Sequence, residues 1–114
     1  TDWNILLDQR GGPNHVGNFC FAPMHADVNT GELIYTLTYY YIGHFSKFIR
    51  PGARRVSTAP SRSHLLATSF LNRDGSLVTV VMNQSDEVIN YKLIVEGRQT
   101  AAAIQPHAIQ TLVY

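Results

Sequence analysis

The 114-residue sequence is poor in cysteine and in charge. Its single cysteine, Cys20, excludes a disulfide within the chain and any metal site built from several cysteines. Charged residues make up 15% of the chain, against about 25% in an ordinary soluble domain. The formal net charge of +1 argues against nucleic-acid binding, because the neutralisation of phosphates needs a basic face. The shortage of charge also indicates that a partner or further chain covers part of the surface.

Long apolar runs are absent as well. No stretch approaches the roughly 20 apolar residues that span a bilayer. The first residues, Thr1-Asp2-Trp3-Asn4, include neither an initiator Met nor a charged leader followed by an apolar stretch. We therefore expect a piece cut from a longer protein, with no visible signal peptide.

The first half of the chain has the pattern of one strand, one long loop and one helix. The nearly continuous apolar run Trp3–Leu7 predicts a strand buried on both faces, as in parallel sheets. Turn residues then predict an irregular loop from Asp8 to Gly31, and loops of this length are often functional. Apolar residues at helical spacing predict a helix over Ile34–Ile49, ended by Pro51-Gly52. Two apolar stripes leave this helix little polar face, so we expect it to be covered on more than one side.

The second half is predicted to be all strand. Short apolar or alternating segments separated by turn residues predict six strands: Arg55–Ala59, His64–Leu71, Leu77–Asn83, Val88–Val95, Gln99–Ile104 and Ala108–Val113. Asn72-Arg73-Asp74-Gly75 predicts a hairpin between the second and third. This spacing is typical of an antiparallel sandwich or barrel. Because a lone βα unit cannot bury its own faces, the first half resembles the end of a larger α/β fold.

The acidic residues do not predict a catalytic pair. Glycosidic hydrolysis usually needs two carboxylates on opposite sides of the scissile bond. Asp2 and Asp8 flank a single strand and lie too far apart, and three others fall in or beside predicted hairpin turns, namely Asp74, Asp86 and Glu87. We therefore expect no catalytic residue in this chain.

The remaining reactive side chains predict neither a metal site nor a cofactor. The five histidines are scattered, and none has the spacing of a helical metal site, although His15 and His25 share the long loop. Cys20 lies between Phe19 and Phe21, which favours a buried, inert thiol. Tyr39-Tyr40-Tyr41 would point in different directions on a helix, so packing is favoured over sugar stacking. Asn83-Gln84-Ser85 fits the N-glycosylation pattern, but an ordinary turn is the preferred interpretation.

Four strings of residues resemble a known family. They are Thr1-Asp2-Trp3-Asn4, Gly11-Gly12-Pro13-Asn14, Asn18-Phe19 and Gly43-His44-Phe45-Ser46-Lys47-Phe48-Ile49. Together they resemble the C-terminal part of the glucosylceramidase-like enzymes of glycoside hydrolase family 30. The resemblance covers essentially the whole chain and is weaker after about Asn83.

The resemblance implies a β-rich α+β chain: the last βα unit of a (β/α)8 barrel followed by an antiparallel β-sandwich. Residues 1–50 would hold the eighth strand (Trp3–Leu7), an active-site loop and the eighth helix (Ile34–Ile49), and residues 54–114 most of the sandwich. Enzymes of this family are similar to other retaining glycosidases in using two Glu residues, and no residue here matches either motif. The positions that carry over line the substrate pocket: Trp3, Asn18 and Phe19. A Trp is known in this family at the position of His15, at the aglycone end of the substrate pocket, so His15 departs from the family pattern there.

Three hypotheses follow. The chain is a C-terminal fragment of a retaining β-glycosidase that is inactive alone, a non-catalytic carbohydrate-binding or stabilising module, or one chain of a split glycosidase. In the first and third, the partners are a β-glycoside substrate and the rest of the barrel. A chain that stands alone would self-associate through the Ile34–Ile49 helix.

Overall fold

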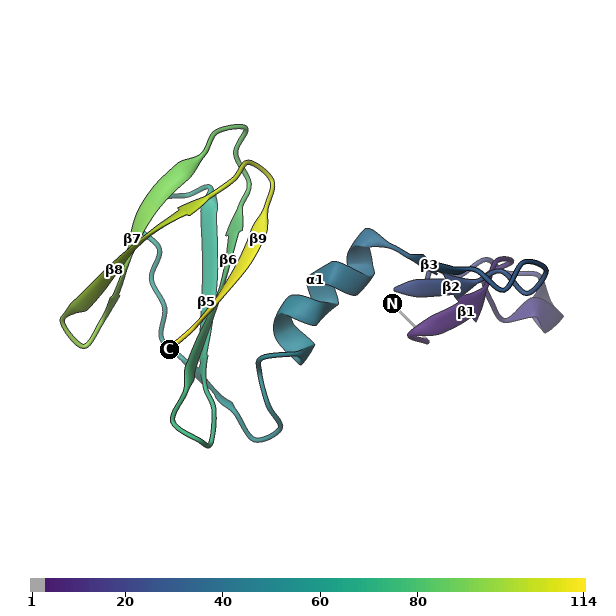
Figure 1. Ribbon diagram of the computed structural model, residues 1–114, viewed down its shortest axis with the longest axis horizontal. Helices are drawn as coiled ribbons and strands as arrows, with labels where there is room; N and C mark the ends of the chain where they lie inside the picture. The colour runs from purple at the N-terminus through teal and green to yellow at the C-terminus, as the bar shows by residue number, and fades with distance from the viewer. Residues whose placement is uncertain (1–3) are drawn as a thin grey trace. The chain divides into compact units, whose positions relative to one another are not determined.

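The structure, a computed structural model, describes residues 4–114 (Figure 1). The chain divides into two compact units, an N-terminal unit of Thr1–Gly43 and a C-terminal unit of His44–Tyr114. In chain order the elements are β1 (Leu6–Asp8), the 3-10 helix η1 (Asn14–Val16), β2 (Met24–Ala26), β3 (Leu33–Tyr35), α1 (Leu37–Ser46), β4 (Arg54–Val56), β5 (Leu65–Leu71), β6 (Leu77–Asn83), β7 (Ile89–Val95), β8 (Arg98–Ile104) and β9 (Ile109–Val113). No helix in the described residues has the length and apolar character needed to cross a membrane.

The N-terminal unit contains a small three-stranded sheet in the order β1-β2-β3. Strand β1 runs parallel to β2, with Leu6 opposite Met24, and β2 is antiparallel to β3, with His25 opposite Ile34. The turn between β2 and β3 is closed by the Asp27 carboxylate, which accepts the backbone N–H groups of residues 29 and 30. The prediction of an irregular loop from Asp8 to Gly31 is therefore wrong, because this segment holds η1, β2 and a closed turn.

The predicted helix limits, Ile34–Ile49, are also wrong, since α1 covers only Leu37–Ser46. At its start, Ile34 and Tyr35 are paired with β2 and cannot be helical. Thr36 still faces β2, because its backbone N–H and its hydroxyl both donate to the Pro23 carbonyl at 3.0 Å. The first strand is similarly displaced along the chain: β1 covers Leu6–Asp8 rather than Trp3–Leu7, and residues 1–3 lie outside the described part.

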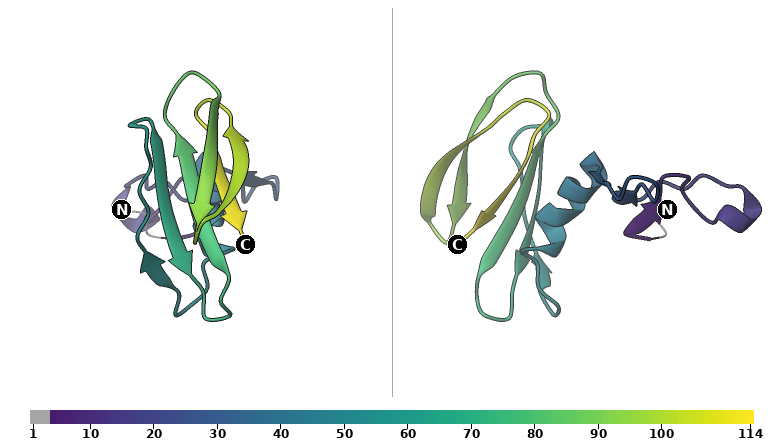
Figure 2. Two further views of the ribbon diagram at one scale, coloured as in Figure 1. Left: turned by 90° about the vertical axis from the view of Figure 1, so that its left-hand side faces the viewer. Right: turned by 45° about the vertical axis from the view of Figure 1, so that its right-hand side comes forward.

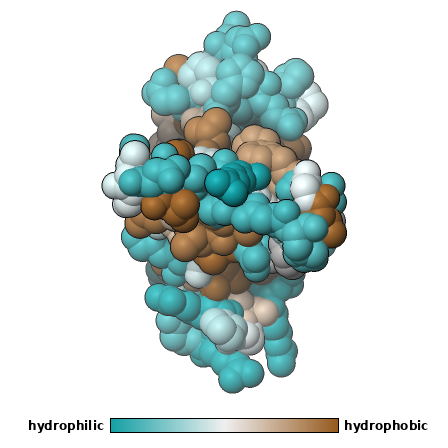
Figure 3. Space-filling model, turned by 90° about the vertical axis from the view of Figure 1, so that its right-hand side faces the viewer, coloured by the Kyte–Doolittle hydropathy of each residue, from teal (hydrophilic) through white to brown (hydrophobic). Residues whose placement is uncertain are grey.

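Apolar side chains on α1 and around β1 are open to solvent. None of the ten residues of α1 is buried, and Leu37 and Tyr40 are 77% and 56% exposed. Ile5 and Leu6 are exposed at the start of the sheet. Figure 3 shows such apolar surface as brown patches among polar side chains. An exposed group of large apolar side chains is typical of a surface that a partner covers.

The C-terminal unit is made of two antiparallel sheets (Figures 1 and 2). One sheet has the order β4-β5-β6-β9, and the other is the hairpin β7-β8. All six predicted strands are confirmed, five of them with limits within one residue of the prediction. The first, β4, is displaced and shorter, ending at Val56 rather than Ala59. The predicted hairpin between β5 and β6 is confirmed, with Gly75 at φ 88°.

The two sheets share a small hydrophobic core at one end. Leu65 of β5, Val81 of β6, Ile89 of β7 and Ile104 of β8 form a buried cluster, against which Leu112 of β9 packs. Burial of such side chains stabilises a fold by about 1.5–3 kcal/mol each. Figures 1 and 2 show the β7-β8 hairpin meeting the larger sheet at this end and diverging from it toward the turn at residues 96–97. The sandwich is therefore closed at one end and open at the other.

Hydrogen bonds attach the segment around the end of α1 to the larger sheet of the same unit. His44 Nδ1 lies 2.9 Å from the Thr111 hydroxyl, which itself donates to the His44 carbonyl. The buried Asn72 amide donates to the Phe48 carbonyl and accepts the Arg50 N–H, both at 3.0 Å. Strand β9 and the turn between β5 and β6 thus both bind the segment 44–50.

Candidate functional site

The chain leaves β1 into a loop, residues 9–23, that we call the rim loop. The Asp8 carboxylate organises its first turn by accepting the Arg10 N–H at 3.0 Å and the Asn14 side-chain amide at 2.7 Å. The next turn is η1, which ends at Gly17 in the left-handed region at φ 67°. The rim loop is therefore a built structure at the carboxyl end of β1, the end at which barrel enzymes place their substrate loops.

Asn18 and Phe19, two of the predicted substrate-binding residues, follow η1 on the rim loop. Both are exposed, and Phe19 retains 57% of its accessible surface. The Phe19 ring makes an edge contact with Phe21 at 5.2 Å and is parallel to the His25 ring at 6.0 Å. Phe21 also meets His25 edge-on at 6.0 Å. An exposed aromatic face supported from behind by other rings can stack on the apolar face of a sugar.

Gly11 allows the rim loop to fold back on itself. It has φ 66°, and a Cβ at this position would lie 2.7 Å from Phe19 Cδ2 and 2.8 Å from the Cys20 carbonyl oxygen. No side chain fits in that space, and the positive φ favours glycine as well. Gly11 therefore brings the first turn of the loop against the backbone that carries Phe19.

His25 lies beneath the same loop and is 7% exposed. Its Nε2 accepts the Ala22 backbone N–H at 3.2 Å, and its Nδ1 lies 2.9 Å from the Asp8 carbonyl oxygen. The side chain thus connects the end of β1 to the far end of the rim loop. The sequence drew attention to Gly11 only as part of a resembling string and to His25 only as a histidine that shares a loop with His15, so the supporting role of neither residue was predicted.

A shallow cavity of about 420 Å³ lies beside β1 in the N-terminal unit. It is lined by both ends of the strand and the first turn of the rim loop, including Asn4, Leu7, Asp8, Gly12 and Asn14. The third predicted substrate-binding residue, Trp3, lies outside the described residues. The structure therefore places two of the three on one loop and leaves the third untested.

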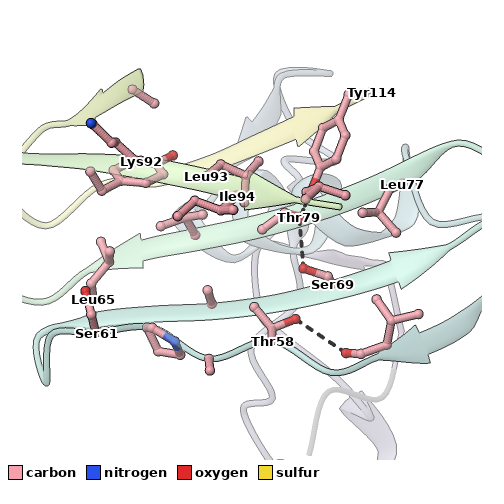
Figure 4. A pocket seen from close by; sticks show the side chains of 18 of the residues that line it. Thr58, Ser61, Leu65, Ser69, Leu77, Thr79, Lys92, Leu93, Ile94 and Tyr114 are labelled. Carbon is pink, nitrogen blue, oxygen red and sulfur yellow. Dashed lines mark hydrogen bonds between the residues drawn. The ribbon is translucent and has the colours of Figure 1, made fainter. Parts of the chain in front are cut away.

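The open end of the sandwich forms a larger groove of about 1150 Å³ within the C-terminal unit. Figure 4 shows its floor, where the hydroxyls of Ser69, Thr79 and Tyr114 are linked in a chain of 2.7 Å and 2.9 Å hydrogen bonds. Tyr91 lines the opposite side, and its hydroxyl donates to Gln110 at 2.9 Å. Burial raises the pKa of this phenol. The groove is mixed in character, with hydroxyl groups beside apolar side chains from both sheets.

Four of the aspartates in the described residues stabilise turns or form a surface pair. Asp8 and Asp27 bind the backbone of the loops that follow them, and Asp86 pairs with His107 at 2.7 Å on the surface. The pKa of Asp74 is held below its ordinary value by hydrogen bonds from the Ser76 hydroxyl and the Ser76 N–H. A general acid needs the opposite shift, so Asp74 is unsuited to that role.

The other candidate groups were histidines, a cysteine and a run of tyrosines. Residues 4–114 contain no cluster of three or more His, Cys, Asp or Glu side chains able to hold a metal ion. His15 is exposed on η1, and Cys20 is a free thiol that is only partly buried, which corrects the expectation of a buried one. Tyr39 packs edge-on against Tyr35 and Tyr40.

Asn83 is 1% exposed, and its side chain is used inside the fold. The Nδ2 group donates to the carbonyls of Glu87 at 2.7 Å and Gln105 at 3.0 Å. The Oδ1 atom accepts the N–H and the hydroxyl of Ser85. The preferred interpretation of Asn83-Gln84-Ser85 as a turn is confirmed.

Comparison with known families divides the chain in the middle. Residues 1–49 match the profile described as "Glycosyl hydrolase family 30 TIM-barrel domain", and residues 52–112 match "Glycosyl hydrolase family 30 beta sandwich domain". The lysosomal acid glucosylceramidase of Mus musculus is 44% identical over 88 residues, covering 76% of this chain and 17% of the mouse protein. The putative glucosylceramidase 1 of Caenorhabditis elegans is 33% identical over 121 residues, covering all of this chain and 23% of the worm protein.

Two solved structures extend the comparison. SrfJ from Salmonella typhimurium superimposes with a TM-score of 0.93 at 35% identity over 99% of this chain and 25% of that one. The endo-β1,6-glucanase BT3312 gives a TM-score of 0.84 at 25% identity over 96% of this chain and 25% of that one. The chain thus spans about a sixth to a quarter of the length of these relatives.

Proposed function

Since the chain belongs to glycosyl hydrolase family 30, with the end of the family's barrel followed by its β-sandwich, we propose that it is the C-terminal part of a retaining β-glycosidase. In this proposal residues 1–50 supply the last barrel strand, the substrate-facing loop and the last helix, and residues 54–114 supply the sandwich. The reaction is hydrolysis of a β-glucosyl linkage, for which the similarity to glucosylceramidases is the support.

The observation that carries the proposal is the rim loop at the carboxyl end of β1. It presents Asn18 and Phe19 to solvent on a support of rings and backbone hydrogen bonds. The Phe19 ring would stack on the apolar face of the sugar, and the Asn18 amide would bind a sugar hydroxyl. This chain's part in the reaction is to bind and orient the glycoside.

The two carboxylates of the reaction are proposed to come from chain outside residues 1–114. In a retaining enzyme one acts as acid and then base at the leaving oxygen, and the other forms the covalent glycosyl-enzyme. An origin of both carboxylates outside this chain is supported by Asp8, Asp27 and Asp86, because their side chains are occupied in turns or a surface pair. We therefore expect the isolated chain to hydrolyse nothing.

The partner of this chain is proposed to be the rest of the barrel. The exposed apolar side chains of α1 and β1, such as Leu37 and Leu6, support this role, because a barrel covers its strands and the inner faces of its helices. Without that partner, these side chains would drive self-association. Analytical ultracentrifugation of the purified chain is then expected to show oligomers, and a monomer at high concentration would contradict this part of the proposal.

The test is to express the reading frame that extends upstream of Thr1 and to assay an aryl β-glucoside. We expect hydrolysis in which proton NMR detects the β-anomer of the sugar first, as retention requires. Replacement of either of two upstream Glu residues should abolish turnover, whereas the isolated chain should show none. Turnover by the isolated chain, or an upstream frame without barrel strands, would refute the proposal.

A non-catalytic module is the second candidate, and the groove of the C-terminal unit is the observation that favours it. The groove has hydroxyl groups and the Tyr91 and Tyr114 side chains available to a carbohydrate. Calorimetric titration with glucosides and glycans separates the candidates. Saturable binding that is lost in a Tyr114→Ala variant but kept in a Phe19→Ala variant would favour the module.

A further inference from the structure

The hydrogen bonds of His25 determine the protonation of its ring. The Ala22 N–H points at Nε2, so Nε2 must carry a lone pair, and the Asp8 carbonyl opposite Nδ1 can only accept, so Nδ1 must carry the proton. The imidazole is therefore neutral, with its proton on Nδ1. A second proton, on Nε2, would meet the Ala22 N–H head-on and remove that hydrogen bond.

The same ring supports the exposed aromatic side chains of the rim loop. Phe19 lies parallel to it at 6.0 Å and Phe21 meets it edge-on at 6.0 Å. Ala22, the residue that His25 bonds, is one residue beyond Phe21 and three beyond Phe19. A change at His25 Nε2 therefore acts directly on the segment that carries Phe19.

We propose that His25 is a positioning residue for the glycoside site: as a neutral imidazole it holds the rim loop against the end of β1, and its protonation releases Phe19 and weakens substrate binding. This inference rests on the proposed function for the role of Phe19, whereas the hydrogen-bond switch itself does not. Binding through the rim loop is then favoured above the pH at which His25 takes up its second proton and is reduced below it.

Other ionisable groups lie on the segments that contact His25: Asp8 on β1, Arg10 and Cys20 in the rim loop, Asp27 after β2, and Glu32 and Tyr35 on the β3 side. The Asp8 carboxylate is occupied by the Arg10 N–H and the Asn14 amide. The Asp27 carboxylate is occupied by two N–H groups of its own turn. A release caused by His25 differs from one caused by these groups, because it should disappear when His25 is replaced by a group that does not titrate.

The first test is nitrogen-15 NMR of the histidine rings in the full 114-residue chain. At neutral pH we expect His25 with its proton on Nδ1, and on acidification the Ala22 amide and the Phe19 ring signals should shift at the same midpoint as His25. His15, which is exposed on η1, is the internal control. Its titration should leave Phe19 unchanged. The proposal would be overturned by a His25 proton on Nε2 at neutral pH, or by Phe19 ring signals that do not shift at the His25 midpoint.

Two variants separate the two hydrogen bonds of the ring. In His25→Gln the side-chain oxygen can replace Nε2 as the acceptor for Ala22, whereas in His25→Asn the amide can replace only the Nδ1 donor. We expect hydrogen exchange of the Ala22 amide to stay near the wild-type rate in His25→Gln and to rise roughly tenfold in His25→Asn. Equal exchange rates in both variants would contradict the assigned direction of the Ala22 bond.

The second test uses the enzyme expressed from the whole reading frame. In the wild type we expect KM for an aryl β-glucoside to rise on acidification through the His25 midpoint, and in His25→Gln that rise should be absent. His25→Asn should raise KM several-fold at neutral pH with kcat nearly unchanged. His64→Gln, at an exposed position of the C-terminal unit, serves as the control. A KM profile unchanged in His25→Gln would overturn the role in binding. An enzyme without β-glycosidase activity would instead refute the proposed function and leave the NMR result to decide the switch.

Discussion

The substitution Asn83→Ala tests how the turn after β6 stabilises the C-terminal unit. The Asn83 side chain makes four hydrogen bonds of 3.0 Å or less: Nδ2 donates to the Glu87 and Gln105 carbonyls, and Oδ1 accepts the N–H and the hydroxyl of Ser85. A typical hydrogen bond contributes about 1 kcal/mol net, and buried groups left unpaired cost about 1–3 kcal/mol more. The Ser85 hydroxyl lies 3.1 Å from the Glu87 carbonyl and can donate its one proton there when Asn83 Oδ1 is removed, so part of the loss is recovered. We expect the free energy of unfolding to fall by about 2–4 kcal/mol.

The assay is urea unfolding followed by far-ultraviolet circular dichroism, which reports on the strands. Trp3 fluorescence would not serve, because this residue belongs to the other unit. Gln84→Ala is the matched control, because Gln84 is the exposed residue that follows Asn83. This substitution should change the free energy of unfolding by less than about 0.5 kcal/mol. A loss below about 0.5 kcal/mol in Asn83→Ala would refute the assignment of these bonds to stability.

Asn83→Asp tests whether the side chain at this position is buried, through the direction in which stability changes with pH. The aspartate keeps the acceptor toward Ser85 but sets a negative oxygen against two carbonyls, so at neutral pH the loss should at least equal that of the alanine variant. Burial without a cation favours the protonated carboxyl in the folded state. The free energy of unfolding of this variant should therefore rise as pH falls. A stability independent of pH would contradict the buried position of this side chain.

Three further predictions concern other positions. Gly11→Ala should lower the free energy of opening of the rim loop by more than about 1 kcal/mol. Gly17 has a similar φ but open space around it, so Gly17→Ala should cost only the backbone strain. Hydrogen exchange of residues 9–23 measures both effects. Thr79→Val should break the hydroxyl chain beneath the groove and lower the free energy of unfolding by about 1–2 kcal/mol in urea unfolding. Ser76→Ala should return the pKa of Asp74 toward its ordinary value, as measured by NMR titration of the carboxyl.

Each of these has an outcome that would contradict it. Equal exchange in the two glycine variants would show that the close approach to Phe19 is unimportant. Thr100→Val, on the exposed side of β8, is the control for Thr79 and should leave stability unchanged. For Asp74, whose folded pKa is lowered, the stabilisation is present above the ordinary pKa and is lost as pH falls through the lowered one. A Ser76→Ala chain with the wild-type dependence on pH would contradict this.

The C-terminal unit could be predicted from the sequence because its signals are local. Each strand is bounded by turn residues, and Gly75 and Gly97 adopt the positive φ values that these turns require. The alternation of apolar and polar residues in β7 is a local signal too, and Ile89 and Tyr91 of this strand lie in or against the core. The four-stranded order β4-β5-β6-β9 was beyond this reasoning, since the pairing of β6 with β9 depends on the whole unit.

The N-terminal unit was harder because its contacts are not local. Ile34 fits the helical spacing of α1 as well as it fits a strand. Its pairing with His25 places it in strand β3. The exposed position of Phe19 followed from resemblance alone. The supports beneath it, Gly11 and His25, act across 8 and 6 residues of sequence, which no periodic pattern records.

The position of β9 beside β6 has a consequence for the folding rate. The β5-β6 and β7-β8 hairpins close over short turns, so both can form early. Strand β9 must instead close a loop over the whole segment 84–108 before its pairing with β6 stabilises the chain. Such a non-local pairing forms slowly, because closing the loop lowers the chain entropy before any contact stabilises the closed loop. We expect β9 to dock last, so that until its final residues are in place β6 remains an unpaired edge of the larger sheet.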